Sequence, residues 1–185
     1  MGPSVKFIDN LILRVENESC AKSVLELYQR NKINFEQFEP TRPNDFYTLE
    51  YHKRMLHREY MAYLSNKFIR YFIYSDKNPS RIIGAINYNI MNNGKNDYAE
   101  LGYKVDIMYQ QQGIAYKACL STFDILANEY GIDRIDARIH PHNIASIRLA
   151  EKIGFKPICL EPKSANILGH YVDLIRYSVN ISEIQ

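Results

Sequence analysis

Hydrophobic positions along the chain follow two periods, one typical of helices and one typical of strands. Apolar residues at helical spacing predict four helices, at residues 19–31, 44–66 and 144–153 and in a segment that runs up to Tyr130. Alternating or continuous apolar runs predict about seven strands. The order of these elements predicts an α+β fold in which most neighbouring strands are antiparallel. The predicted strands cover residues 11–15, 68–74, 81–91, 101–108, 134–140, 155–160 and 167–179.

Two turn signals and one crossover organise these strands. Residues 76–80, Asp-Lys-Asn-Pro-Ser, predict a hairpin, and residues 92–97 predict a second turn. The strand–helix–strand unit over residues 101–140 instead requires parallel strands with a right-handed crossover. No repeat, low-complexity tract or linker interrupts the sequence, so we expect a single domain over residues 1–185.

The segment at residues 110–115, Gln-Gln-Gln-Gly-Ile-Ala, joins the strand and the helix of that unit. Successive backbone N–H groups converge at a helix N-terminus, where the helix dipole favours phosphate. Gly113 lets a ligand approach the backbone closely, and Ala115 is small enough not to block it. The segment therefore predicts an anion-binding turn, although one glycine is equally compatible with an ordinary strand-to-helix connection.

Composition narrows the class of protein. The net charge of +2 gives no indication of nucleic acid or a membrane surface as a partner. The cysteines, Cys20, Cys119 and Cys159, are far apart and indicate reduced thiols in a cytoplasmic protein, with no disulfide framework and no metal site. No apolar run approaches the roughly 20 residues that span a bilayer. The N-terminus also lacks the apolar region of a signal peptide.

Several segments of the sequence resemble the GNAT superfamily of N-acetyltransferases. Residues 110–115 match its pyrophosphate signature, Q/R-x-x-G-x-G/A, with the glutamine, the glycine and the alanine in place. Residues 140–155 resemble its N-x-x-S…EK-x-GF segment, and residues 99–103 resemble its fourth strand. The more specific resemblance, over residues 68–179, is to the ribosomal-protein-alanine N-acetyltransferase branch.

The resemblance implies a GNAT-like fold and acetyl-CoA as cofactor, with CoA as the product. In that fold a mostly antiparallel sheet of about seven strands is flanked by four helices, and one parallel strand pair splays apart. The pantetheine arm lies in the gap and pairs with the backbone of the first of these two strands, while the amides of the following turn bind the pyrophosphate. The residues that the resemblance assigns to the cofactor are Tyr103, Val105, Ile107, Gln110, Gln111, Gln112, Gly113, Ile114, Ala115, Tyr116, Asn143 and Ser146.

The resemblance also indicates which residues perform the transfer. Acetyl transfer to an amine needs a neutral nucleophile, oxyanion stabilisation and a proton donor for the departing thiolate. Glu100, on the polar face of the strand that the thioester crosses, is the predicted base, and a solvated carboxylate with an ion-pair partner is the alternative. Ser146 is predicted to donate to the thiolate, and Tyr171 on a late strand is a second candidate acid. Asn143 fits both pantetheine binding and a helix N-cap.

The amine acceptor is expected to lie against the first two helices and the loop between them. Candidate contacts are Glu39, Tyr47, Tyr51 and His52, with Glu39 able to pair with an ammonium group before deprotonation. The acceptor is a primary amine, either the N-terminus of a ribosomal-protein-like substrate or a small polyamine, amino acid or aminoglycoside. A non-catalytic acyl-CoA-binding domain is the third interpretation, and we expect a monomer or homodimer. The carboxylates of this region favour neither class of acceptor; they are Glu36, Glu39, Asp45, Glu50 and Glu59.

Overall fold

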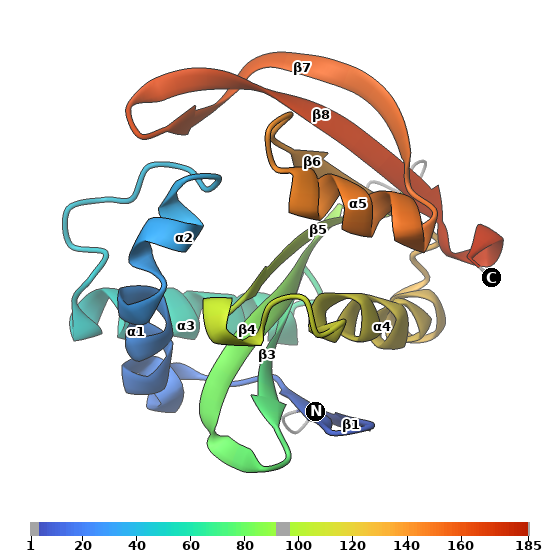
Figure 1. The fold of residues 1–185 in the computed structure, drawn as a ribbon. Coiled ribbons are helices and arrows are strands. Elements are labelled where there is room, and N and C mark those ends of the chain that lie inside the picture. Colours follow the sequence, from blue (N-terminus) through green and yellow to red (C-terminus); the bar gives the residue numbers. More distant parts are fainter. Residues whose placement is uncertain (1–3, 92–96, 185) are drawn as a thin grey trace.

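The computed structural model describes residues 4–91 and 97–184, and one mixed sheet runs through them (Figure 1). The sheet has eight strands in the order β1-β2-β3-β4-β5-β6-β8-β7. Strands β5 and β6 are parallel, as predicted, and the other neighbouring pairs in the described residues are antiparallel. The strands are β1 (Val5–Ile8), β2 (Leu11–Arg14), β3 (Phe68–Ser75), β4 (Asn78–Met91), β5 (Tyr98–Val105), β6 (Arg134–Ile139), β7 (Lys156–Ile167) and β8 (His170–Asn180).

Five α-helices lie on the two faces of the sheet in the same residues (Figure 1). None of the helices in the described ranges combines the length and the hydropathy needed to cross a bilayer. Short 3₁₀ turns precede α1, precede the turn to α4 and follow β8. These elements are α1 (Ala21–Arg30), α2 (Lys32–Glu36), α3 (Leu49–Leu64), α4 (Ile114–Tyr130), α5 (Ile144–Ile153), η1 (Glu18–Cys20), η2 (Ile107–Tyr109) and η3 (Ile181–Glu183).

The sheet separates two hydrophobic clusters. The larger contains buried side chains of α4 and α5, and the other contains those of α1 and α3. Strand β4 contributes to both clusters, because its successive side chains point to opposite faces: Ile83 packs in the first cluster and Ile82 in the second. The fully buried Cys119 of α4 belongs to the first cluster.

The capping residues end the helices where the sequence indicates. Helix α4 ends at Gly131, which has φ +65°, and α5 ends at Gly154, which has φ +112°. The side chain of Asn143 caps the first turn of α5, as predicted. Left-handed backbone favours glycine, so these residues are effective stop signals.

The structure corrects several other boundaries. Strand β1 and helix α2 were not predicted, because each has only four or five residues and too short a pattern to detect. Helix α3 begins at Leu49 and not at residue 44, since Thr48 caps its first turn. Strand β7 extends beyond residue 160 because it is an edge strand, where a proline such as Pro162 breaks no ladder bond. The predicted turn at residues 92–97 lies largely outside the described residues.

The parallel strands diverge soon after they meet. Strand β5 pairs with β4 over its whole length, but it pairs with β6 at only three positions in the described structure, ending at Glu100 and Asp136. Strand β6 turns instead to β8, with which it pairs over all six of its residues. The backbone of residues 101–105 therefore has no strand on one side, which is the splayed arrangement expected for this fold.

The β7–β8 hairpin arches over the end of the molecule that contains α2 (Figure 1). Its turn is tied to the loop between α2 and α3 through Thr41. The Thr41 N–H donates to the carbonyl of Asn166 at 2.8 Å, and the Thr41 hydroxyl donates to Oδ1 of Asn166 at 2.8 Å. The N–H of Gly169 donates to the same hydroxyl at 3.1 Å. Two segments far apart in the sequence thus meet beside the splayed strands.

Candidate active site

Helix α4 begins directly after a left-handed turn. Gly113 has φ +74° and Gln111 has φ +60°, so the chain turns sharply between β5 and the helix. A Cβ added to Gly113 would meet no atom of the described residues within 4 Å, so the space in front of the turn is open. Side chains cap the first turns of α3 and α5, whereas none in the described part of the chain caps α4. Its first backbone N–H groups are therefore available to an anion.

Two glutamine side chains brace this turn. Nε2 of Gln110 donates to the carbonyl of Val105 at 3.2 Å, and Nε2 of Gln112 donates to the carbonyl of Met108 at 3.3 Å. Both side chains are thus used within the connection itself. These glutamines therefore hold the backbone of the turn in place, and a ligand would chiefly contact that backbone.

Asp106 anchors the connection between β5 and the turn. Its buried carboxylate accepts hydrogen bonds from Nε of Arg30 at 2.5 Å and from Nη2 of Arg81 at 3.4 Å. Burial raises the pKa of Asp106, but hydrogen bonds, led by that from Arg30, lower it overall, and the carboxylate stays charged. The next N–H, that of Ile107, donates to Oδ1 of Asn31 at 2.8 Å. This N–H, within the segment expected to contact pantetheine, is therefore already paired in the structure.

The N-terminus of α5 adjoins the unpaired half of β5. Oδ1 of Asn143 accepts the N–H of Ser146 at 3.2 Å, so the amide of Asn143 acts as an N-cap in this structure. Ser146 is half-buried, and the buried hydroxyl of Tyr103 on β5 lies beside it. Burial raises the pKa of Tyr103, and the Ser146 side chain opposes this increase. Tyr103, Asn143 and Ser146 are thus brought together in the structure.

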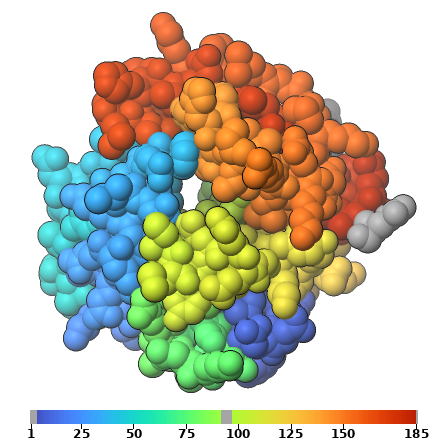
Figure 2. Space-filling model, viewed as in Figure 1, coloured from blue at the N-terminus to red at the C-terminus, as the bar shows by residue number. Residues whose placement is uncertain are grey.

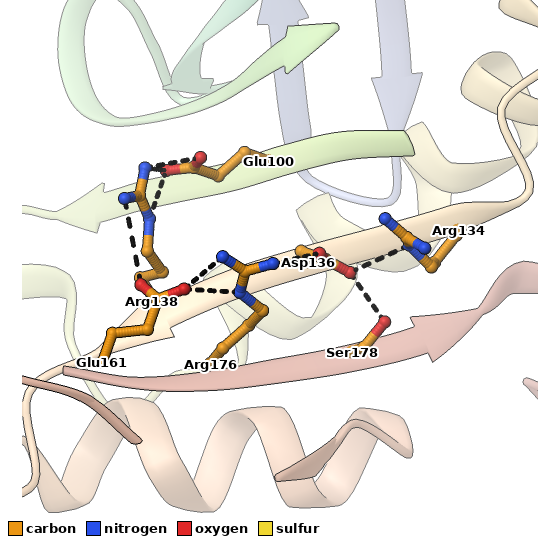
Figure 3. Close-up of polar contacts among 7 residues, drawn as sticks. All are labelled: Glu100, Arg134, Asp136, Arg138, Glu161, Arg176 and Ser178. Atoms are coloured by element: carbon orange, nitrogen blue, oxygen red, sulfur yellow. Dashed lines mark hydrogen bonds and ion pairs between the residues drawn. The ribbon is translucent and has the colours of Figure 1, made fainter. Parts of the chain in front are cut away.

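Glu100 lies in a chain of charged side chains that involves four strands, β5, β6, β8 and β7 (Figure 3). Nη2 of Arg138 on β6 lies 2.7 Å from each carboxylate oxygen of Glu100. The hydrogen bond to Glu100 is the main cause that raises the pKa of Arg138. Arg138 also faces Glu161 of β7, which pairs with Arg176 of β8. The alternative to a catalytic base was a carboxylate with an ion-pair partner. Arg138 is such a partner for Glu100.

Arg138 was not singled out from the sequence. The sequence pattern that could have indicated it is the alternation along β6, which puts Asp136 and Arg138 on the same polar face. The parallel register then places Asp136 beside Glu100. Asp136 is itself buried and accepts a hydrogen bond from the Ser178 hydroxyl at 2.7 Å. The polar face of β5, β6 and β8 is therefore a connected network and not a set of solvated charges.

Tyr171 is at the outer end of the β7–β8 hairpin and is 70% exposed. It stands five residues before Arg176, which is opposite Arg138 in the β6–β8 register. At about 3.3 Å per residue this separation along β8 is roughly 17 Å. No hydrogen bond or ring contact joins Tyr171 to Glu100 or Ser146 in the described residues, so the structure does not group this candidate acid with them.

Glu39 was expected to contact the acceptor, and in the structure its carboxylate already has cationic partners. Nζ of Lys104 lies 2.7 Å from Oε1 of Glu39, and Arg42 pairs with the other oxygen. Lys104 also donates to the hydroxyl of Tyr28 at 3.0 Å. Burial lowers the pKa of Lys104 to about 8. Lys104 and Arg42 were not predicted as site residues from the sequence, because neither belongs to a motif.

The aromatic candidates at α3 lie in a packed cluster. The Tyr47 hydroxyl donates to Glu36 at 2.7 Å, and the Tyr51 ring centroid is 5.0 Å from that of Phe46. His52 is fully buried, and its two ring nitrogens have no hydrogen-bond partner within residues 4–91 and 97–184. Burial lowers its pKa to about 4, so the ring is neutral. The structure therefore places His52, an expected acceptor contact, in a buried position.

The turn before α4 and the loop that contains Glu39 border an opening in the molecular surface. Figure 2 shows it between the blue segment around α2, the yellow-green connection into α4 and the orange start of α5. The braced turn lies on one side of this opening and the loop that contains Glu39 on the other. The arrangement suits a thin, extended ligand that enters beside α4 and presents its end to an acceptor near α2.

Comparisons with known proteins agree with this geometry. Residues 10–156 match the family described as the Acetyltransferase (GNAT) domain. The chain is 29% identical over 153 residues to the probable N-acetyltransferase YjcK of Bacillus subtilis (strain 168), a match that covers 83% of this chain and 84% of that protein. It is 25% identical over 154 residues to the [Ribosomal protein uS5]-alanine N-acetyltransferase of Escherichia coli (strain K12), covering 80% and 76%.

A solved structure shares the fold over nearly the whole chain. The ribosomal-protein-S5-alanine acetyltransferase from Vibrio fischeri superposes with a TM-score of 0.90 at 23% identity, covering 98% of this chain and 99% of that one. The family match confirms the predicted class of enzyme, an N-acetyltransferase that uses acetyl-CoA. This chain belongs to the GNAT acetyltransferase family.

Proposed function

We propose that this enzyme acetylates the N-terminal amine of a protein or peptide, as a ribosomal-protein-type N-acetyltransferase. The observation that carries the proposal is the state of the acceptor-side carboxylates. Four of the five carboxylates of this region are paired, and only Glu50 has no partner in the described residues: Glu36 is bonded to Tyr47, Glu39 to Lys104 and Arg42, Asp45 to Arg54 and Glu59 to Arg70. A polyamine or aminoglycoside needs free carboxylates, so this pairing favours an acceptor with a single amine.

The acetyl donor fits the turn before α4. The uncapped N–H groups of α4 and the left-handed Gly113 suit the pyrophosphate, which we place against the amides of residues 111–116. The free backbone of β5 around Tyr103 and Val105 is proposed to pair with the pantetheine arm. Asn143 would reach the same arm from the other side. The donor supplies an activated acetyl thioester.

Glu100 remains the proposed base, and Ser146 remains the proposed hydrogen-bond donor to the departing thiolate. Glu100 would accept the amine proton directly or through a water molecule, and to do so it must exchange one of its contacts with Arg138. A hydrogen bond seen without substrate does not exclude such a role, because catalytic geometry often forms only in the complex. The Ser146 hydroxyl would donate to the departing thiolate. Tyr171 is too exposed and too far along β8 to be our choice for this step.

The relatives support the peptide acceptor independently of the carboxylates. The Escherichia coli relative is named for acetylation of the alanine of ribosomal protein uS5. The structural neighbour is named for the corresponding reaction, and its fold matches this chain from end to end. An alanine at the acceptor N-terminus is therefore the first sequence to test.

The experiment is a panel of acceptors with acetyl-CoA, in which free thiol is followed over time. The panel contains peptides that begin with alanine or serine, the same peptides with a blocked N-terminus and an internal lysine, spermidine and an aminoglycoside. We expect thiol release with the free N-terminal amines and not with the blocked peptides. Preferential turnover of spermidine or the aminoglycoside would refute the proposal and support the small-molecule alternative. Tight acetyl-CoA binding without turnover across the panel would support a non-catalytic domain.

A further inference from the structure

The hydroxyl of Tyr103 is a buried polar group without a complete hydrogen bond. It has no partner of good geometry in the part of the chain that the structure describes. Buried hydroxyls in folded proteins are generally paired, and an unpaired one calls for a specific explanation. Because Tyr103 is on the unpaired half of β5, this hydroxyl borders the proposed path of the thioester.

A neighbouring tyrosine shows that the fold can satisfy such a group. Tyr88 lies on β4, next to β5, and is also buried. Its hydroxyl is 2.7 Å from the hydroxyl of Thr122 on α4, and the two form a hydrogen bond. Tyr88 is fully buried and Tyr103 only half-buried, but both hydroxyls are enclosed, and only that of Tyr88 has a hydrogen bond of good geometry. The contrast indicates that the hydroxyl of Tyr103 has a role other than stabilising the fold.

The side chain of Ser146 interacts with the Tyr103 hydroxyl. It lowers the pKa of Tyr103, whereas burial raises this pKa by more. The backbone N–H of Ser146 is held by the Asn143 side chain at 3.2 Å, so the first turn of α5 is fixed in position. The effect of Ser146 on the pKa of Tyr103 comes from a side-chain hydrogen bond between the two residues that lacks good geometry, and no other hydrogen bond of the Ser146 hydroxyl is found among the described residues. Two hydroxyls without complete partners therefore meet between β5 and α5.

We propose that Tyr103 is a positioning residue, whose hydroxyl donates to Oγ of Ser146 in the reacting complex and directs the Ser146 proton toward the departing sulfur. This inference rests on the proposed function, in which Ser146 donates to the thiolate. A chain of two hydroxyls strengthens the terminal donor, because each hydrogen bond polarises the next. The relay works only when both hydroxyls are present.

The step balances without a proton leaving either hydroxyl. The amine nitrogen forms the new C–N bond and gives its proton to Glu100, the C–S bond breaks, and the electron pair of that bond leaves on sulfur. Ser146 stabilises that charge by a hydrogen bond and Tyr103 supports Ser146, while the thiolate takes its proton from water. Burial raises the pKa of Tyr103 above the ordinary value near 10, and a thiol has a pKa of about 8.5. The thiolate is thus too weak a base to take the phenolic proton.

The test is a double-mutant cycle with Tyr103→Phe and Ser146→Ala, measured by thiol release with the best peptide of the panel. We expect Tyr103→Phe to lower kcat roughly tenfold, the effect of one ordinary hydrogen bond made in the transition state, with little change in the KM for acetyl-CoA. In the Ser146→Ala background the same change should have no further effect on kcat. A further tenfold loss in that background, or an unchanged kcat in the single variant, would overturn the proposal while leaving the proposed function intact.

Tyr88→Phe is the matched control. It removes a buried hydroxyl that is already paired, so we expect lower stability in urea unfolding and unchanged kcat. Tyr103→Phe should show the opposite pattern, with unchanged stability and lower kcat. The unfolding comparison requires no acceptor. If Tyr103→Phe destabilises the protein as much as Tyr88→Phe, the Tyr103 hydroxyl is a structural group and the inference is wrong, whatever the activity.

Discussion

The turn at the start of α4 can be tested by adding one methyl group. Gly113 has φ +74°, and an alanine in left-handed backbone costs about 1–2 kcal/mol. The new Cβ meets no described atom within 4 Å, so no clash adds to this cost. For a chain of this size the expected decrease in melting temperature is about 2–8 °C. Gly113→Ala should therefore fold, with a modest loss of stability.

The other end of the same helix provides the control. Gly131 has φ +65°, and a Cβ added there also meets nothing within 4 Å in the described residues. Gly131→Ala should therefore carry the same backbone cost at a position without a proposed ligand. Only at Gly113 does the methyl group occupy the approach to the amides that we assign to the pyrophosphate. Any difference in ligand binding between the two variants then reports on that approach.

Calorimetric titration with acetyl-CoA separates the two effects. We expect Gly113→Ala to weaken binding at least about tenfold, which corresponds to roughly 1.4 kcal/mol, and Gly131→Ala to leave the affinity unchanged. Equal affinities in the two variants, or equal losses in both, would refute the assignment. The pyrophosphate would then be bound elsewhere, and the open turn would be an ordinary connection from strand to helix.

Two further measurements examine the base and the buried histidine. Glu100→Gln should lower turnover by about 10²-fold with unchanged acetyl-CoA affinity if Glu100 is the base, whereas a loss of stability alone would identify its pair with Arg138 as structural. Burial lowers the pKa of His52 to about 4 from 6.5, so the unfolded chain binds more protons than the folded chain between these values and stability falls as the pH falls through them. His52→Phe should remove this loss. The free energy of unfolding of the variant relative to the parent, measured in urea, should be about 2 kcal/mol more favourable at pH 5 than at pH 7. An equal difference between variant and parent at the two pH values would contradict the assignment.

Features encoded by neighbouring residues were predictable from the sequence. Gly113, Gly131 and Gly154 mark the ends of α4 and α5, and Asn143 marks the start of α5. In each case the residue type meets a local backbone or capping requirement. The same locality explains why the turn before α4 could be recognised as a motif.

Contacts between distant residues could not be predicted in this way. The pair between Glu100 and Arg138 joins residues 38 positions apart, and it depends on the register of two parallel strands. The pair between Lys104 and Glu39 joins a strand to an irregular loop, and no periodicity indicates it. The sequence therefore revealed which side chains were polar, but not which of them neutralise each other. The burial of His52 could not be predicted for a related reason, since a histidine on an aromatic helix face does not show whether that face is buried.

The sheet consists of two blocks of strands, one containing β1 to β5 and the other containing β6, β8 and β7. The three residue pairs between the parallel strands β5 and β6 form a short seam between these blocks. The ion pair between Glu100 and Arg138 crosses this seam, because one residue belongs to each block. A hinge-like change in the angle between the blocks would alter the distance between the proposed base and its partner arginine. An extended ligand bonded along the free edge of β5 would stiffen the seam. Donor binding and the readiness of Glu100 to accept a proton would then be mechanically linked, without contact between the donor and the carboxylate.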